Sequence, residues 1–103
     1  MATFKVTSII DGDTFEVSPR WQWKGQVGTR VRPTGYNAPE LSACALHADR
    51  HTYGGQAAKE KLSRLILGEE VDLRAAHKVD RGRLVCDVYY KGKYLADYFP
   101  EYQ

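Results

Sequence analysis

The chain has 103 residues, which is enough for one domain with a hydrophobic core and too few for two. Fifteen Lys and Arg residues against 13 Asp and Glu residues leave a net charge of +2, which permits a phosphate-bearing partner without requiring one. No apolar run approaches the roughly 20 residues of a membrane-spanning helix, so no membrane partner is expected. We therefore expect a monomer with a single domain over residues 1–103.

The cysteines and the N-terminus say little about function. Cys44 and Cys86 lie far apart without C-x-x-C spacing, which excludes a zinc ribbon or thioredoxin motif but leaves open whether they pair. Cys44, His47 and His51 could bind zinc if that stretch were helical, although an exposed loop is the favoured interpretation. Met1 leads into a predicted strand without a secretory signal. We expect a cytosolic protein, or an exported one whose signal has been removed.

The first third of the chain is rich in β-branched and aromatic residues and predicts three strands. The turn at Asp11-Gly12 joins the first two as a hairpin, with a positive φ expected at Gly12. Alternation places four side chains on one face of the first strand, those of Phe4, Val6, Ser8 and Ile10. The predicted strands cover residues 3–10, 14–17 and 27–36, with a break at 18–20 and a bent continuation over 21–24.

One helix and two further strands follow. Residues 37–55 are predicted to be irregular, and a helix is predicted after them because apolar residues recur at helical spacing at Ala58, Leu62, Leu65 and Ile66. Gly68 stands where a glycine commonly ends a helix. The last two strands are predicted over 71–76 and 84–90. This order predicts a mainly β fold, a five-stranded Greek-key barrel of the OB type with one helix between strands 3 and 4.

Two short segments carry oxygen ligands. In Asp11-Gly12-Asp13-Thr14, a hairpin turn explains every residue except Asp13, a second carboxylate at the mouth of the strand. In residues 31–40, Asn37 and Glu40 follow the end of the third strand on either side of a stiffening proline. Carboxylate and amide oxygens on a stiff loop are what Ca²⁺ prefers, although a surface charge at Glu40 is the simpler interpretation.

Two arginines in different segments are candidates for binding a phosphate. Arg32 lies in the third strand, where a solvent-facing arginine is the simplest explanation. Arg83 closes the segment Asp80-Arg81-Gly82-Arg83, which by itself predicts only a charged turn. Together the two planar guanidinium groups could hold one phosphate from two sides, a task that suits arginine better than lysine.

Taken in order, Asp-Gly-Asp-Thr, Val-Arg-x-x-Gly-Tyr-Asn-Ala-Pro-Glu, a helix and Asp-Arg-Gly-Arg resemble the staphylococcal nuclease (thermonuclease) family over residues 5–97. The resemblance implies calcium-dependent hydrolysis of DNA or RNA phosphodiesters, with cleavage on the 5′-oxygen side. It implies that Arg32 and Arg83 are catalytic arginines and that Glu40 positions or deprotonates the attacking water. The calcium ligands that it implies are Asp13, Asn37 and the backbone carbonyl of Ala38.

The match departs from the family pattern at two positions. Asn37 stands where the family usually has a second metal-binding aspartate, so one negative charge is missing and calcium should bind more weakly. Arg81 stands close to where the family often has a phosphate-binding tyrosine. An alternative is therefore a catalytically weak or inactive OB module that binds single-stranded nucleic acid or a protein partner.

Several aromatic residues offer faces on which a base could stack. Strand spacing favours core positions and cross-strand pairs for Trp21, Trp23 and the Tyr89-Tyr90 pair. Tyr98 and Tyr102 are likewise expected to pack at the end of the barrel rather than to bind bases.

Overall fold

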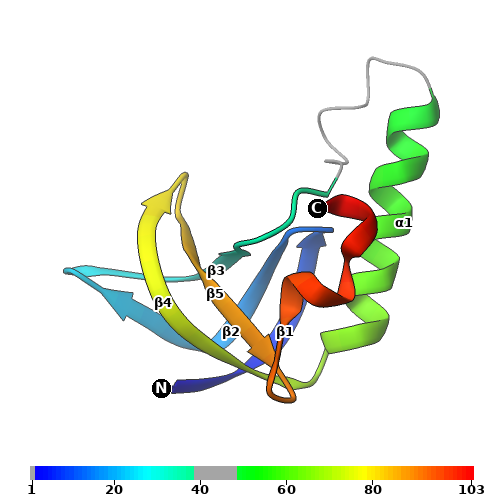
Figure 1. Ribbon diagram of the computed structural model, residues 1–103. Coiled ribbons are helices and arrows are strands. Elements are labelled where there is room, and N and C mark those ends of the chain that lie inside the picture. Colours follow the sequence, from blue (N-terminus) through cyan, green and yellow to red (C-terminus); the bar gives the residue numbers. More distant parts are fainter. Residues whose placement is uncertain (1, 39–48) are drawn as a thin grey trace.

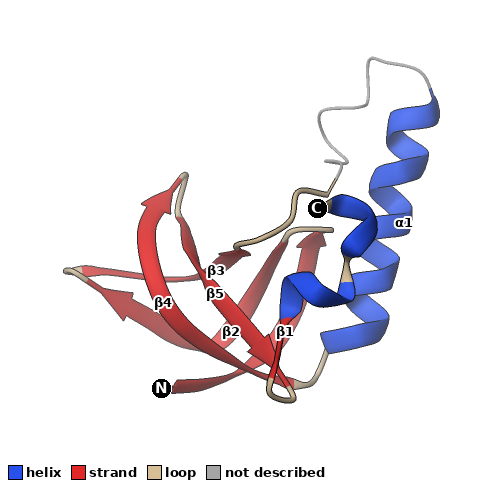
Figure 2. Cartoon of the chain, in the orientation of Figure 1, coloured by secondary structure: helices blue, strands red, loops and turns tan. Residues whose placement is uncertain are grey.

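The computed structural model describes residues 2–38 and 49–103, and it confirms the predicted mainly β fold. A closed, five-stranded mixed barrel carries one helix between its third and fourth strands, as in an OB fold (Figures 1 and 2). No described helix is long and apolar enough to cross a membrane. The elements are β1 (Ala2–Asp11), β2 (Thr14–Trp23), β3 (Gln26–Pro33), α1 (Asp49–Ile66), β4 (Glu70–Asp80), β5 (Arg83–Tyr90), the short β6 (Lys93–Tyr94), and the 3-10 helices η2 (Leu95–Tyr98) and η3 (Pro100–Tyr102).

The barrel is closed by a parallel pairing between β3 and β5. The strands run in the order β3-β2-β1-β4-β5-β6, and the neighbours in this order pair antiparallel. Across the closure Arg30 is opposite Arg83, and Arg32 is opposite Val85. Two polar segments that lie about 50 residues apart in the sequence are therefore held at neighbouring positions of one sheet.

The helix α1 packs one face against the barrel (Figure 1). Ala58, Leu62 and Ile66 have no exposed surface, which confirms the predicted apolar face. Gly68 adopts a φ of +82° just after the helix, as expected for a terminating glycine. Its amide donates to the Val6 carbonyl at 2.9 Å, which ties the end of α1 to β1.

The helix begins earlier than the sequence pattern indicates. Residues 49–55 were expected to be irregular, but the structure starts α1 at Asp49 and continues it through Gly54 and Gly55. Once the packed turns from residue 57 onward are formed, each further residue adds one hydrogen bond for one residue fixed. That gain offsets the cost of about 1 kcal/mol for a glycine in a helix.

The strands differ from the predictions in register and length. In β1 the buried side chains are Val6 and Ile9, rather than an unbroken alternation to Ile10, because the pairing with β2 shifts between Val6 and Ser8. The second strand is continuous through a cis Ser18–Pro19 peptide, so the expected break is absent there. The third strand ends at Pro33 rather than at residue 36, and β4 runs to Asp80 rather than to residue 76.

The aromatic residues largely take the structural roles that strand spacing favours. Trp21 and Tyr90 are buried in the core, and Trp23 is partly buried against it. Tyr98 and Tyr102 also pack against the core, and the Tyr98 hydroxyl donates to the Tyr90 carbonyl at 3.3 Å. Tyr89 forms a tilted cross-strand pair with Tyr94.

Candidate functional site

The turn between β1 and β2 is held in place by close packing around Gly12. A Cβ atom at Gly12 would lie 2.5 Å from the Cβ of Ala58 in α1 and 2.7 Å from the Cβ of Ala38. Gly12 does not have the positive φ predicted from the turn motif, so that prediction is wrong. Glycine is required here because the side chains of Ala58 and Ala38 leave no room for a Cβ atom. The tight packing fixes the position of the next residue, Asp13.

The buried hydroxyl of Tyr36 supports the same turn from the other side. It donates to the carbonyl of Gly12 at 2.8 Å, and its ring stacks on Phe99 with a centroid separation of 4.6 Å. Burial raises the pKa of Tyr36 far above its ordinary value, and the negative charge of Asp13 adds to this effect while Arg32 opposes it. The hydroxyl therefore remains a donor at physiological pH.

Asp13 is a carboxylate with only 3% of its surface exposed, and its charge is balanced by Arg32. The Nη2 atom of Arg32 lies 3.3 Å from Asp13 Oδ2 and 2.6 Å from Asn37 Oδ1. The two side chains predicted to bind a metal therefore converge on one cationic atom. A buried carboxylate needs such a partner, because an isolated charge of this kind is costly to remove from water.

Arg83 joins the same network through Thr14. Its Nη1 donates to Thr14 Oγ1 at 3.2 Å, and Thr14 Oγ1 in turn donates to Asp13 Oδ1 at 3.5 Å. On its other side Arg83 donates to the side chain of Asp80 at 3.2 Å and to the Asp80 carbonyl at 3.4 Å. The network is continuous through six side chains, in the order Asn37, Arg32, Asp13, Thr14, Arg83 and Asp80.

The structure thus brings four of the predicted site residues together at one edge of the barrel, namely Asp13, Arg32, Asn37 and Arg83. Sequence reasoning had singled out neither Thr14 nor Asp80, although both lie inside the quoted motifs. Their role becomes visible only when β2 and β5 lie close enough for the Thr14 hydroxyl to accept from Arg83.

The remaining predicted residues are only partly described. Glu40 lies outside the described residues. Ala38 is buried beside Gly12, and the role of its carbonyl as a ligand stays a prediction. The alternative zinc site rests on Cys44 and His47, which lie outside the described residues, and on the side chain of His51, which is not described either.

The chemistry of the donor set fits a hard cation. Carboxylate, amide and carbonyl oxygens are the groups that bind Ca²⁺. In this structure the carboxylate of Asp13 and the amide oxygen of Asn37 both contact Arg32 Nη2. Within residues 2–38 and 49–103, no three His, Cys, Asp or Glu side chains gather into a metal-binding group. A calcium site here would therefore depend on Asn37, the Ala38 carbonyl, Glu40 or water besides Asp13.

The fold and this network define an OB-type barrel with a buried carboxylate linked to two arginines at its rim. A scan against protein-family models finds no matching family, and a search of curated proteins finds no match. The functional argument therefore rests on the residues and their geometry.

Proposed function

We propose that this chain is a calcium-dependent nuclease of the thermonuclease type that hydrolyses phosphodiester bonds in DNA, RNA or both. The observation that carries the proposal is the continuous network in which Arg32 and Arg83, from different strands, flank the buried carboxylate of Asp13. The resemblance of the three motifs to the staphylococcal nuclease family supports the same activity.

The two arginines suit the electrostatic demands of phosphodiester hydrolysis. The substrate is an anion and repels an approaching hydroxide, and negative charge builds up on the phosphate oxygens in the transition state. Guanidinium groups that are already held in position stabilise that charge without reorganising, and one such donor contributes roughly 3–4 kcal/mol in other enzymes. Arg83 is only 15% exposed, so water screens its charge weakly.

The proposed calcium ligands are Asp13, Asn37 and the carbonyl of Ala38. A bound calcium ion would supply Lewis-acid stabilisation of the phosphate. The protein's own contribution is to hold the ligand oxygens in place, since Gly12 packs against α1 and Tyr36 donates to the Gly12 carbonyl. Glu40 is proposed to position or deprotonate the attacking water, a step that contributes about 10²–10⁴-fold in enzymes generally.

One observation favours the alternative of a non-catalytic OB module. Arg32 already satisfies both Asp13 and Asn37, so the network is complete without a metal ion. In that interpretation the ion pair is purely structural, and the barrel binds single-stranded nucleic acid or a protein partner without cleaving it. The two functions differ in their dependence on divalent ions.

The decisive experiment compares cleavage of single-stranded DNA and RNA by the purified chain with calcium and with chelator. Arg83→Ala should lower turnover by about 10²–10³-fold, the effect of removing one preorganised donor. Arg30→Ala is the matched control, because Arg30 is opposite Arg83 in the sheet but is half exposed and pairs with Glu16 instead. Thermal unfolding of both variants separates a loss of chemistry from a loss of fold.

Two further variants test the assigned roles. Asn37→Asp adds the negative charge that the family pattern has, so it should lower the calcium concentration needed for half-maximal cleavage. Glu40→Gln should lower turnover sharply while the fold persists. If chelator leaves cleavage unchanged, the proposed dependence on calcium is wrong. If Arg83→Ala and Arg30→Ala behave alike, the catalytic role proposed for Arg83 is wrong. Binding of oligonucleotides without cleavage would establish the module instead.

A further inference from the structure

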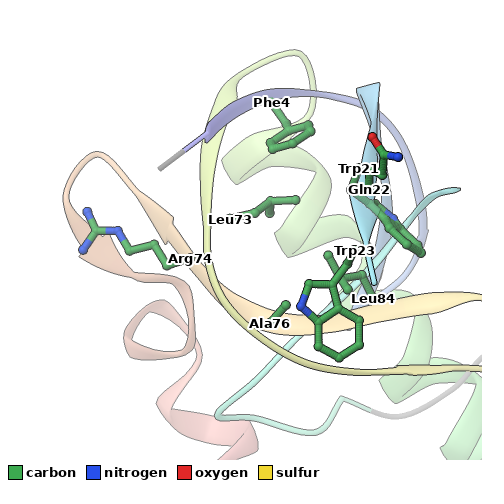
Figure 3. Close-up of a pocket in the computed structure, with 8 residues that line it drawn as sticks. All are labelled: Phe4, Trp21, Gln22, Trp23, Leu73, Arg74, Ala76 and Leu84. Carbon is green, nitrogen blue, oxygen red and sulfur yellow. The ribbon is translucent and has the colours of Figure 1, made fainter. Parts of the chain in front are cut away.

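A second feature lies in the part of the barrel away from α1. Figure 1 shows α1 against one side of the barrel, while the β2–β3 hairpin and the β4–β5 arm spread apart on the other side. Between them is a pocket of about 150 Å³. Its wall is formed by apolar and aromatic side chains from four strands, those of Phe4, Trp21, Trp23, Leu73, Ala76 and Leu84 (Figure 3).

One ring of the pocket wall, that of Trp21, is held in place by a hydrogen bond and by close packing. The indole N–H of Trp21 donates to the Arg30 carbonyl at 2.8 Å, which fixes the ring against β3. Gly28 leaves room for this ring, because a Cβ there would lie 2.7 Å from Trp21. Leu84 faces the barrel interior, whereas the preceding Arg83 joins the polar network, so the pocket and that network are separate.

The size and surface of the pocket suit a single flat ring. An apolar cavity of about 150 Å³ in another protein binds benzene, so this volume takes one ring. Aromatic side chains stack on nucleobases with little sequence preference, because every base has a π face. The side chain of Arg74 also borders the pocket, but Figure 3 shows its guanidinium pointing away, where it lies over the Tyr89 ring and pairs with Asp72.

A positive charge at the edge of the aromatic wall indicates which kind of ring fits. The ammonium group of Lys24 lies 4.9 Å from the centroid of the Trp23 ring. A purely apolar occupant would make no use of this charge, whereas a base carries a phosphate beside it. We propose that the pocket binds one unpaired base of a single-stranded nucleic acid, with the adjoining phosphate near Lys24. The choice of ligand rests on the proposed function, but the pocket is distinct from the cleavage site.

Intrinsic fluorescence provides a direct test, because Trp21 and Trp23 are the chain's two tryptophans and both line the pocket. The probe is cytidine monophosphate, whose base is a single ring, titrated with chelator present. Ala76→Phe fills the pocket and should weaken the saturable quenching by about tenfold or more, the range of one lost base stack. Ala75→Phe is the matched control: the neighbouring residue is exposed and does not line the pocket, so quenching should match the wild-type chain.

A second variant covers the case in which Ala76→Phe does not fold. Lys24 is exposed and has a φ of 48°, a conformation that asparagine tolerates. Lys24→Asn should therefore keep the fold and weaken the binding of cytidine monophosphate, but not that of cytidine. Equal quenching in the Ala75→Phe and Ala76→Phe variants, quenching by inorganic phosphate alone, or no quenching by the nucleotide would overturn the inference.

The Arg83→Ala variant distinguishes a failure of the nuclease proposal from a failure of the base-binding inference. In the Arg83→Ala variant, cleavage should be lost while the quenching persists, because Arg83 is not part of the pocket. If quenching disappears together with cleavage in that variant, the nucleotide binds at the catalytic network, and the pocket is not a base-binding site.

Discussion

Replacing Gly12 with alanine tests whether the packing of the β1–β2 turn against α1 positions the candidate site. A methyl group there would meet the Cβ of Ala58 at 2.5 Å and that of Ala38 at 2.7 Å. Carbon atoms in contact normally lie about 3.5–4.0 Å apart. Either α1 or the turn must therefore move by roughly 1 Å, because a Cβ atom cannot rotate away from its own backbone.

The loss of stability expected for Gly12→Ala can be estimated from this steric overlap. Inserting one methyl group into a well-packed site destabilises a protein by about 1–3 kcal/mol. For a domain of this size each kcal/mol lowers the melting temperature by roughly 4–8 °C. A loss of about 2 kcal/mol therefore predicts a fall of roughly 8–16 °C. Cleavage should fall as well if the proposed function holds, because Asp13 is the residue that follows the turn.

A double-mutant cycle with Ala58→Gly identifies the cause. By itself Ala58→Gly should cost about 1 kcal/mol as a glycine within a helix and roughly 1 kcal/mol more for the lost methyl group, because Ala58 has no exposed surface. Combined with Gly12→Ala it removes the nearest methyl group, so the two changes together should cost less than their sum by about 1 kcal/mol. Urea unfolding, followed by tryptophan fluorescence, measures all four free energies.

Two results would refute the packing explanation. If the two substitutions are additive within about 0.3–0.5 kcal/mol, the methyl groups do not meet and Gly12 serves another purpose. If Gly12→Ala leaves the melting temperature unchanged, the turn can accommodate a methyl group, and the close contacts with Ala58 and Ala38 do not constrain it.

Two further predictions follow from shifted pKa values. Burial raises the pKa of the Cys86 thiol to about 12, so in a Cys44→Ser variant Cys86 should resist alkylation at mildly alkaline pH until the chain unfolds; rapid labelling of the folded protein would contradict this. The Thr34 hydroxyl, and secondly His77, lower the pKa of Asp87, so this carboxylate stabilises the fold above its ordinary pKa of 3.8, and the contribution is lost as the pH falls through the depressed value. Asp87→Asn should make stability less dependent on pH in that acidic range, and an unaltered pH profile of urea unfolding would disprove the role.

Local patterns in the sequence predicted the five strands of the barrel and the helix in their correct order, but not β6 or the two 3-10 helices. The spacing of Ala58, Leu62 and Ile66 identified the buried face of the helix, and Gly68 identified its end. The same patterns placed the helix start too late and missed the register shift in β1 after Val6. Both errors arise because packing and strand pairing override local preference, and neither is visible in a short window of residues.

The sequence by itself determined the OB-type order of strands and helix, and it identified the polar motifs. Both depend on periodicity and turn chemistry, which are properties of neighbouring residues. Only the tertiary structure decided that Asp13, Arg32 and Arg83 share one network, because that requires β3 to pair with β5 across the closure of the barrel. It also decided that Gly12 is needed for space rather than for a left-handed conformation, since Ala58 approaches it from a distant helix. Contacts between distant segments depend on the whole barrel, and no local pattern specifies them.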